Sequence, residues 1–123
     1  MNPPLAAAAM SAILWISPAS AQSLPERDAL SDRMGQIGET VFVLSLGDCR
    51  SPRETRSLAT RQAAFDALKA RYRRLRNEDA PVQIVIVERV NCSTGAFNAA
   101  IRRLDQQLAT ARRLLDREEA GED

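Results

Sequence analysis

The chain has 123 residues, and its 17 basic and 16 acidic residues leave a net charge of +1. This length suits one small domain, and the near-neutral balance argues against nucleic-acid binding. The chain has no histidine and two cysteines, which excludes Ser-His-Asp and Cys-His catalysis, histidine-ligated zinc and four-thiolate metal sites, so we expect no metal and no cofactor.

The first residues have the pattern of an export signal. Leu5 to Ile16 is an uncharged apolar stretch, long enough for the core of a signal peptide but too short to span a bilayer. Ala19-Ser20-Ala21 then supplies the small residues that signal peptidase accepts. We expect residues 1–21 to be cleaved and residues 22–123 to form one periplasmic or secreted domain, which is then not an integral membrane protein.

The first expected element of the mature chain is a short helix. Ser23 and Glu26 have the spacing of a capping box. Apolar residues then recur at helical spacing, and two glycines weaken the end of the pattern (Leu30, Met34 and Ile37; Gly35 and Gly38). The next run, Thr40 to Leu46, is continuously apolar and rich in β-branched residues, which predicts a strand buried on both faces.

The sequence predicts a second helix that begins near Ser51. Ser51, Pro52 and Glu54 fit the N-cap, the first helical position and the reciprocal capping position. This helix should extend to about Arg76, with an apolar stripe facing the core (Leu58, Phe65, Leu68, Tyr72 and Leu75). Residues 82–90, rich in valine and isoleucine, predict a second strand.

The last helix is expected from about Thr94 to Glu118, followed by an acidic tail that frays. The element order is therefore α-β-α-β-α. Two strands joined by a long helix should pair in parallel through a right-handed crossover. The sequence predicts a small α/β domain with a two-stranded parallel sheet and a right-handed βαβ crossover.

The two cysteines each follow a predicted strand. In a parallel βαβ unit the carboxyl ends of both strands lie on one edge, so Cys49 and Cys92 should be neighbours. In an oxidising compartment such a pair forms a disulfide. The cross-link would stabilise the fold by about 4 kcal/mol in the chain-entropy model.

Arginines dominate the second helix, and six of them form a candidate face for an anionic partner. A solvated helix surface is the simpler interpretation of this charge, and the acidic tail offers an intramolecular partner for it. The candidate residues are Arg53, Arg56, Arg71, Arg73, Arg74 and Arg76.

These observations favour an exported, disulfide-linked binding or accessory protein without catalysis. Its partner would be an extracytoplasmic protein or an anionic surface, and the sequence makes no prediction of the oligomeric state. One alternative is a thiol-disulfide oxidoreductase that uses Cys92 with Cys49, because Cys92 precedes a helix whose dipole would lower the pKa of the thiol. Another alternative is a secreted effector or toxin.

Overall fold

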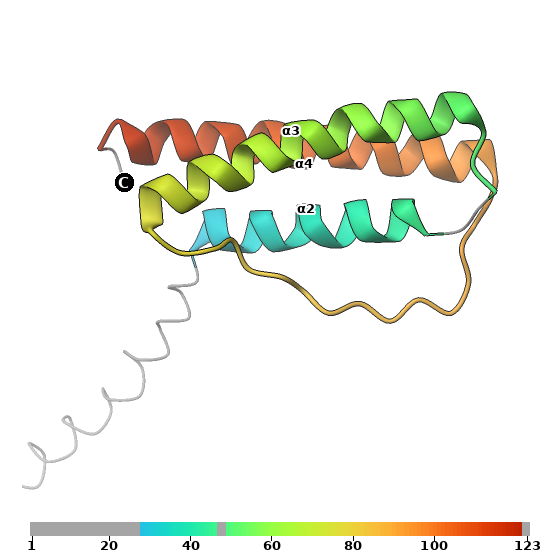
Figure 1. Ribbon diagram of the computed structural model, residues 1–123, viewed down its shortest axis with the longest axis horizontal. Coiled ribbons are helices and arrows are strands. Elements are labelled where there is room, and N and C mark those ends of the chain that lie inside the picture. Colours follow the sequence, from blue (N-terminus) through green and yellow to red (C-terminus); the bar gives the residue numbers. More distant parts are fainter. Residues whose placement is uncertain (1–27, 47–48, 122–123) are drawn as a thin grey trace, which may run out of the picture.

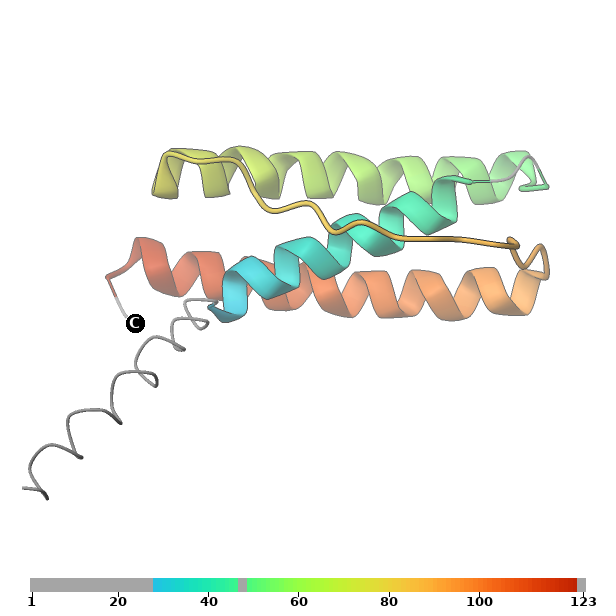
Figure 2. The ribbon, with the colours of Figure 1, turned by 90° about the horizontal axis from the view of Figure 1, so that it is seen from below.

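The computed structural model describes residues 28–46 and 49–121, and three helices make up most of them. Helix α2 spans Ala29–Ser45, α3 spans Pro52–Arg76 and α4 spans Thr94–Glu119. Helices α3 and α4 run parallel to each other, and α2 runs in the opposite direction and crosses beneath both (Figure 1 and Figure 2). Residues 78–92, which we call the strap, return in extended form from the end of α3 to the start of α4.

The N-terminal predictions lie largely outside this description. The expected signal peptide, its cleavage site after Ala21 and the capping box at Ser23 and Glu26 all precede the described residues. Within the described residues, α2 begins at Ala29, and Asp28 is its N-cap. The Asp28 carboxylate accepts a hydrogen bond from the Ser31 amide at 2.6 Å, which satisfies a donor of the first turn.

The prediction of an α/β fold is wrong. Residues 28–46 and 49–121 contain no strand, so neither the two-stranded parallel sheet nor the βαβ crossover forms there. The run from Thr40 to Leu46, expected as the first strand, lies instead in the last turns of α2 and its C-cap. The Thr40 hydroxyl donates to the Gln36 carbonyl at 3.0 Å, as β-branched hydroxyl residues do inside helices.

Burial explains why this run is helical. The buried side chains of α2 recur at spacings of three and four residues along its whole length (Leu30, Met34, Ile37, Thr40 and Leu44). Continuing the helix to Ser45 therefore keeps one apolar face against α3 and α4. That gain outweighs the β-propensity of Val41, Phe42 and Val43, because secondary-structure propensity is a weak term beside tertiary packing.

The second predicted strand, residues 82–90, has largely extended backbone with a bend at Glu88, and the described residues offer it no strand to pair with (Figure 1). Its expected neighbour is helical, so the ladder has no second member. The segment instead forms most of the strap, which lies across the outer side of α2 (Figure 2).

Helices α3 and α4 confirm the sequence prediction closely. Around Ser51, its hydroxyl accepts from the Glu54 amide and the Glu54 carboxylate accepts from the Ser51 amide, both at 3.1 Å. Pro52 occupies the first turn, and Asn77 ends the helix in the left-handed conformation. Capping of this kind depends only on neighbouring residues, which is why the sequence located this helix well.

Replacing Ser51 with alanine should lower the free energy of unfolding by about 0.5–2 kcal/mol, because the N-cap acceptor for the Glu54 amide is lost. Urea denaturation followed by circular dichroism measures the change. The matched control is Thr55→Ala, an exposed position one turn later, which should stay within about 0.5 kcal/mol of the wild type. Equal effects of the two substitutions would contradict the role of the capping box.

The core lies where the three helices meet. Met34 and Ile37 of α2, Tyr72 of α3, and Leu104 and Leu115 of α4 are almost completely buried. The stripe predicted for α3 is confirmed for Leu58, Phe65, Leu68 and Tyr72, and Leu75 packs at its margin.

Three separate connections show that α3 and α4 are parallel and in register. Arg61 pairs with Asp105, Arg71 with Asp116 and Cys49 with Cys92, at sequence separations of 44, 45 and 43 residues. The strap makes this arrangement feasible. Its extended backbone can span about 50 Å, more than the roughly 38 Å length of α3.

Candidate functional site

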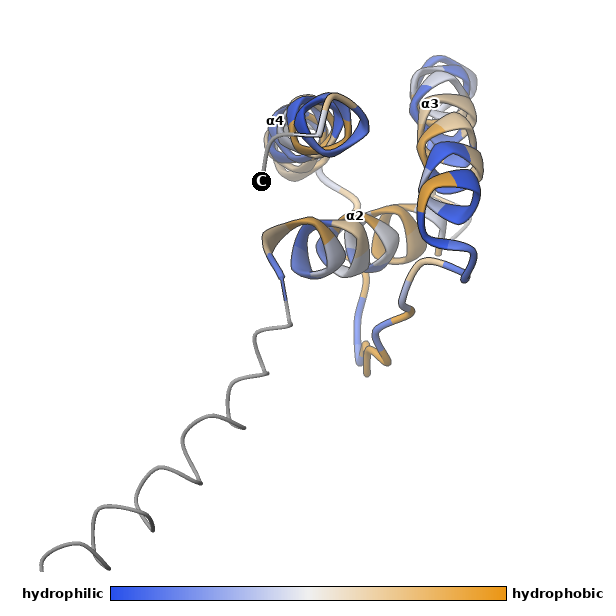
Figure 3. Ribbon diagram, turned by 90° about the vertical axis from the view of Figure 1, so that its left-hand side faces the viewer, coloured by the Kyte–Doolittle hydropathy of each residue, from blue (hydrophilic) through white to orange (hydrophobic). Residues whose placement is uncertain are grey.

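The strap carries the most exposed of the large apolar side chains in the described chain. Val82, Ile84 and Ile86 are 87%, 94% and 88% exposed, and we call these three residues the outer row. They alternate with Gln83, Val85 and Val87, of which the two valines are half-buried. This period of two is that of a strand with one face on the protein and the other open. In Figure 3, orange colouring marks hydrophobic residues of the strap where it runs outside the helices. Exposing a contiguous row of apolar side chains to water is unfavourable, so such rows are uncommon on small proteins.

Gln83 holds the strap against α2. With its amide oriented to suit its neighbours, Nε2 donates to Glu39 Oε1 at 2.8 Å and to the Gly35 carbonyl at 3.3 Å. A Cβ on Gly35 would lie 3.0 Å from Cγ of Gln83, so a glycine permits this close approach. Gly35, which suggested a weak helix end in the sequence, is therefore a contact point inside α2.

The backbone N–H and C=O groups of the strap are not paired with other backbone groups in the described chain. No backbone-to-backbone hydrogen bond involves residues 78–92 within the described chain. An extended segment in this state presents a row of N–H and C=O groups like that of an edge strand.

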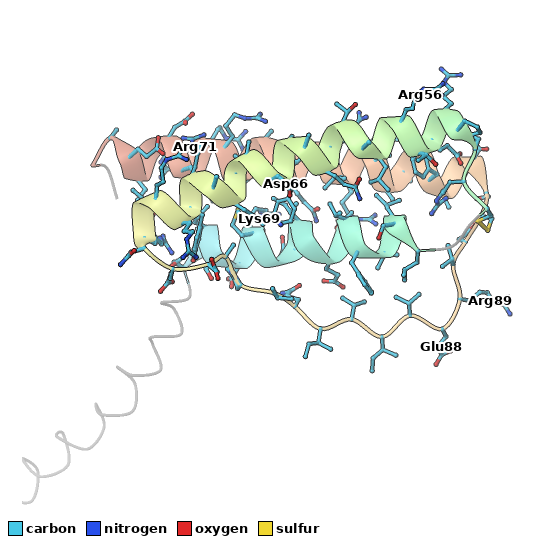
Figure 4. All side chains as sticks on the ribbon, viewed as in Figure 1. Arg56, Asp66, Lys69, Arg71, Glu88 and Arg89 are labelled. Atoms are coloured by element: carbon cyan, nitrogen blue, oxygen red, sulfur yellow. A yellow bond between two sulfur atoms is a disulfide. The ribbon has the colours of Figure 1, made fainter. Side chains whose placement is uncertain are left out.

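A hollow of about 710 Å³ lies beside the strap, between it and helices α2 and α3. Phe42, which is 48% exposed, and Phe65 contribute its aromatic surface. Asp66 and Lys69 lie on the α3 side, with Lys69 Nζ 3.4 Å from Asp66 and 4.8 Å from the centre of the Phe65 ring (Figure 4). On the side of the strap, the hollow is lined by residues Ala80 to Val85. Exposed main chain and apolar surface therefore adjoin each other.

The two cysteines meet at the end of the molecule where α3 and α4 begin. Their Cα atoms are 5.8 Å apart, and the structure places their sulfur atoms at disulfide distance, as the sequence predicted. The reason differs from the predicted one. The strap returns the chain over the length of α3, and this return brings Cys92 to Cys49 without any sheet.

Of the six arginines proposed as an anionic-partner face, three make ion pairs with acidic residues and three do not among the described residues. Arg71 and Arg76 point to acidic residues of α4, and Arg73 pairs with Asp79 of the strap. Arg53, Arg56 and Arg74 are exposed and make no ion pair with other described residues. Arg56 lies near the start of α3 and Arg71 near its far end (Figure 4).

Glu118 and Glu119, which were expected in a frayed tail, belong to α4 and join it to α3, whereas Glu122 and Asp123 lie outside the described residues. The Arg76 guanidinium donates to both oxygens of Glu118, at 2.9 and 2.5 Å, and to Asp28 at 2.7 Å. This cluster connects the start of α2 with the ends of α3 and α4. Nearby, hydrogen bonds from Arg71 lower the pKa of the Glu119 carboxyl below its usual value. These arginines therefore serve the fold.

No family model matches the chain, and no curated protein or solved structure does. Among the described helices, none is both long and apolar enough to cross a membrane. The strap and its hollow are therefore assessed by their own chemistry.

The strap was not among the candidate sites predicted from the sequence. Its apolar composition was assigned to a buried strand, because a continuous Val and Ile run does not reveal whether a partner strand exists. The signal that could have raised the question is Glu88-Arg89, two charges inside the predicted strand. Both project away from the helices in Figure 4.

Proposed function

We propose that the protein is an exported, non-catalytic binding protein that holds an extended segment of a partner polypeptide along the strap. The partner would add as a strand beside residues 82–90. The single observation that carries this proposal is the outer row, three β-branched side chains that are 87–94% exposed on an unpaired extended backbone.

Main-chain chemistry supports an extended polypeptide as the ligand. Strand addition uses the backbone groups of both partners, so it supplies affinity without requiring a particular sequence. No backbone-to-backbone hydrogen bond engages residues 82–90 within the described chain. A globular surface or a small molecule would match this linear row of groups less well.

The hollow beside the strap supports the same ligand class. A strand placed next to the strap on the α3 side would direct alternate side chains toward Phe42 and Phe65. The apolar lining there favours aliphatic residues at those positions. Neighbouring side chains of the outer row would then be partly covered by the cross-strand partners of the added segment.

Export is part of the proposal. The apolar stretch from Leu5 to Ile16 and the small residues Ala19-Ser20-Ala21 support removal of residues 1–21, and a disulfide is typical of an oxidising compartment. The working protein would therefore act in the periplasm or after secretion.

The test uses a short peptide in which valine and threonine alternate between terminal lysines. Its matched control is the same peptide with N-methyl groups on alternate residues, which removes backbone donors and keeps the side chains. We expect the first peptide to shift the amide NMR signals of residues 80–90 and the methylated one to bind at least about ten-fold more weakly. Ile84→Asp should weaken binding, whereas the exposed α3 substitution Thr55→Asp should not. Equal binding of the two peptides, or no shift in the strap, would refute strand addition.

A further inference from the structure

The disulfide occupies a specific mechanical position in the bundle. Cys49 lies two residues before the N-cap of α3, and Cys92 lies directly before the N-cap of α4. Both cysteines are exposed to solvent. The bond therefore joins the N-terminal ends of two parallel helices at a point that a reductant can reach.

At this end of the helix pair, no ion pair joins the described residues of α3 and α4 before Arg61. In α3 no side chain before Leu58 is buried, and in α4 none before Phe97 is buried. A hollow of about 430 Å³ separates the first turns, with mostly polar lining (Ser51, Arg53, Glu54, Ser57, Thr94, Phe97 and Asn98). The Arg50 guanidinium over the Phe97 ring, at 4.8 Å, is a contact immediately beside the disulfide.

The other end of the pair is held quite differently. From Arg61 onward, ion pairs with Asp105, Asp116, Glu118 and Glu119 bridge α3 and α4. Buried residues of both helices lie between these pairs, including Leu68, Tyr72 and Leu115. The bundle thus has one half in which ion pairs as well as core packing join α3 to α4, and another in which the disulfide joins them beside the core residues Leu58 and Phe97.

We propose that the Cys49–Cys92 disulfide is a reducible clasp that controls the opening of the first turns of α3 and α4. This device is independent of the docking proposed above. When the clasp is closed, the two helix ends stay together around their hollow. When it is reduced, the ends separate and expose Leu58 and Phe97, while the half beyond Arg61 stays folded.

The chemistry requires a dithiol reductant, the class of compound that reduces exposed protein disulfides. One thiolate of the reductant attacks one sulfur of the clasp, the S–S bond breaks, and the other cysteine leaves as a thiolate that takes a proton from water. The second thiol of the reductant loses its proton and attacks the mixed disulfide, which releases the remaining cysteine. The reductant ends as a disulfide, and two electrons reach the protein.

Hydrogen exchange of the full chain with and without dithiothreitol tests the clasp. At short labelling times, reduction should speed amide exchange by about ten-fold or more in residues 52–58 and 93–98, whereas residues 61–76 and 101–119 should keep a protection that falls only with the loss of global stability. The Cys49→Ser, Cys92→Ser double variant should show the fast pattern without any response to dithiothreitol.

Three results would overturn the proposal. The first is exchange that rises equally throughout the bundle, which would indicate general destabilisation. The second is a reduced protein whose first turns exchange as slowly as before. The third is a disulfide that dithiothreitol reduces only after the protein has been unfolded in urea.

Discussion

Replacing Phe65 with alanine is expected to lower the free energy of unfolding by about 3–5 kcal/mol. Phe65 is only 8% exposed, and it belongs to the core between α3 and α2, where its ring faces Gly38. Truncation removes apolar contacts and leaves a cavity that two rigid helices fill poorly. Urea denaturation followed by circular dichroism would measure the loss.

The control for this prediction is Arg61→Ala on the same helix. Arg61 donates to both oxygens of Asp105, at 2.8 and 3.0 Å, but the two side chains are 26% and 49% exposed. A solvent-exposed ion pair of this kind contributes at most about 1 kcal/mol. If Arg61→Ala proved more harmful than Phe65→Ala, the apolar stripe of α3 would be assigned to the wrong face.

The single variants Cys49→Ser and Cys92→Ser should each lose about 4 kcal/mol of stability, because the cross-link no longer restricts the unfolded chain. The two cysteines are 43 residues apart in the sequence, so the bond closes a long loop. The expected loss in the free energy of unfolding is large for a domain of this size. The double variant should be little less stable than either single one, since each single substitution already removes the whole bond. Thermal denaturation of the four proteins provides the comparison.

Dithiothreitol offers an independent control in the same experiment. It should lower the melting temperature of the wild type to that of the variants and leave the variants unaffected. If the costs of the two single substitutions added up in the double variant, each cysteine would stabilise the fold through separate contacts. The bond between them would then contribute little.

The sequence predicted correctly those helices whose formation depends on residues close together in the chain. Helix α3 was predicted from Ser51, Pro52 and Glu54, and the structure shows this capping box complete. Helix α4 was predicted within one residue of its observed end at Glu119. Caps and apolar periodicity are properties of consecutive residues, so the sequence contains what is needed to locate these elements.

The proximity of the two cysteines was predicted correctly, although the parallel sheet on which that prediction rested does not form in the described residues. The meeting of the two cysteines requires only that the chain travel along one long element and return over the same distance. Helix α3 and the strap meet that condition, and so Cys92 returns to Cys49. Connectivity and element length decided this contact, and both can be read from a sequence.

The sequence by itself determined the two long helices, the apolar stripe of α3 and the pairing of the cysteines. Only the tertiary structure decided that Thr40 to Ser45 extends α2 and that residues 82–90 remain unpaired. Both runs have β-branched composition, so the local preference of each favours extended backbone. The choice was made by the helix face that Leu30, Met34, Ile37 and Leu44 bury together, since packing against α3 and α4 is worth more than β-propensity. Once the first run became helical, the second lost its partner strand, and the strap acquired the exposed outer row.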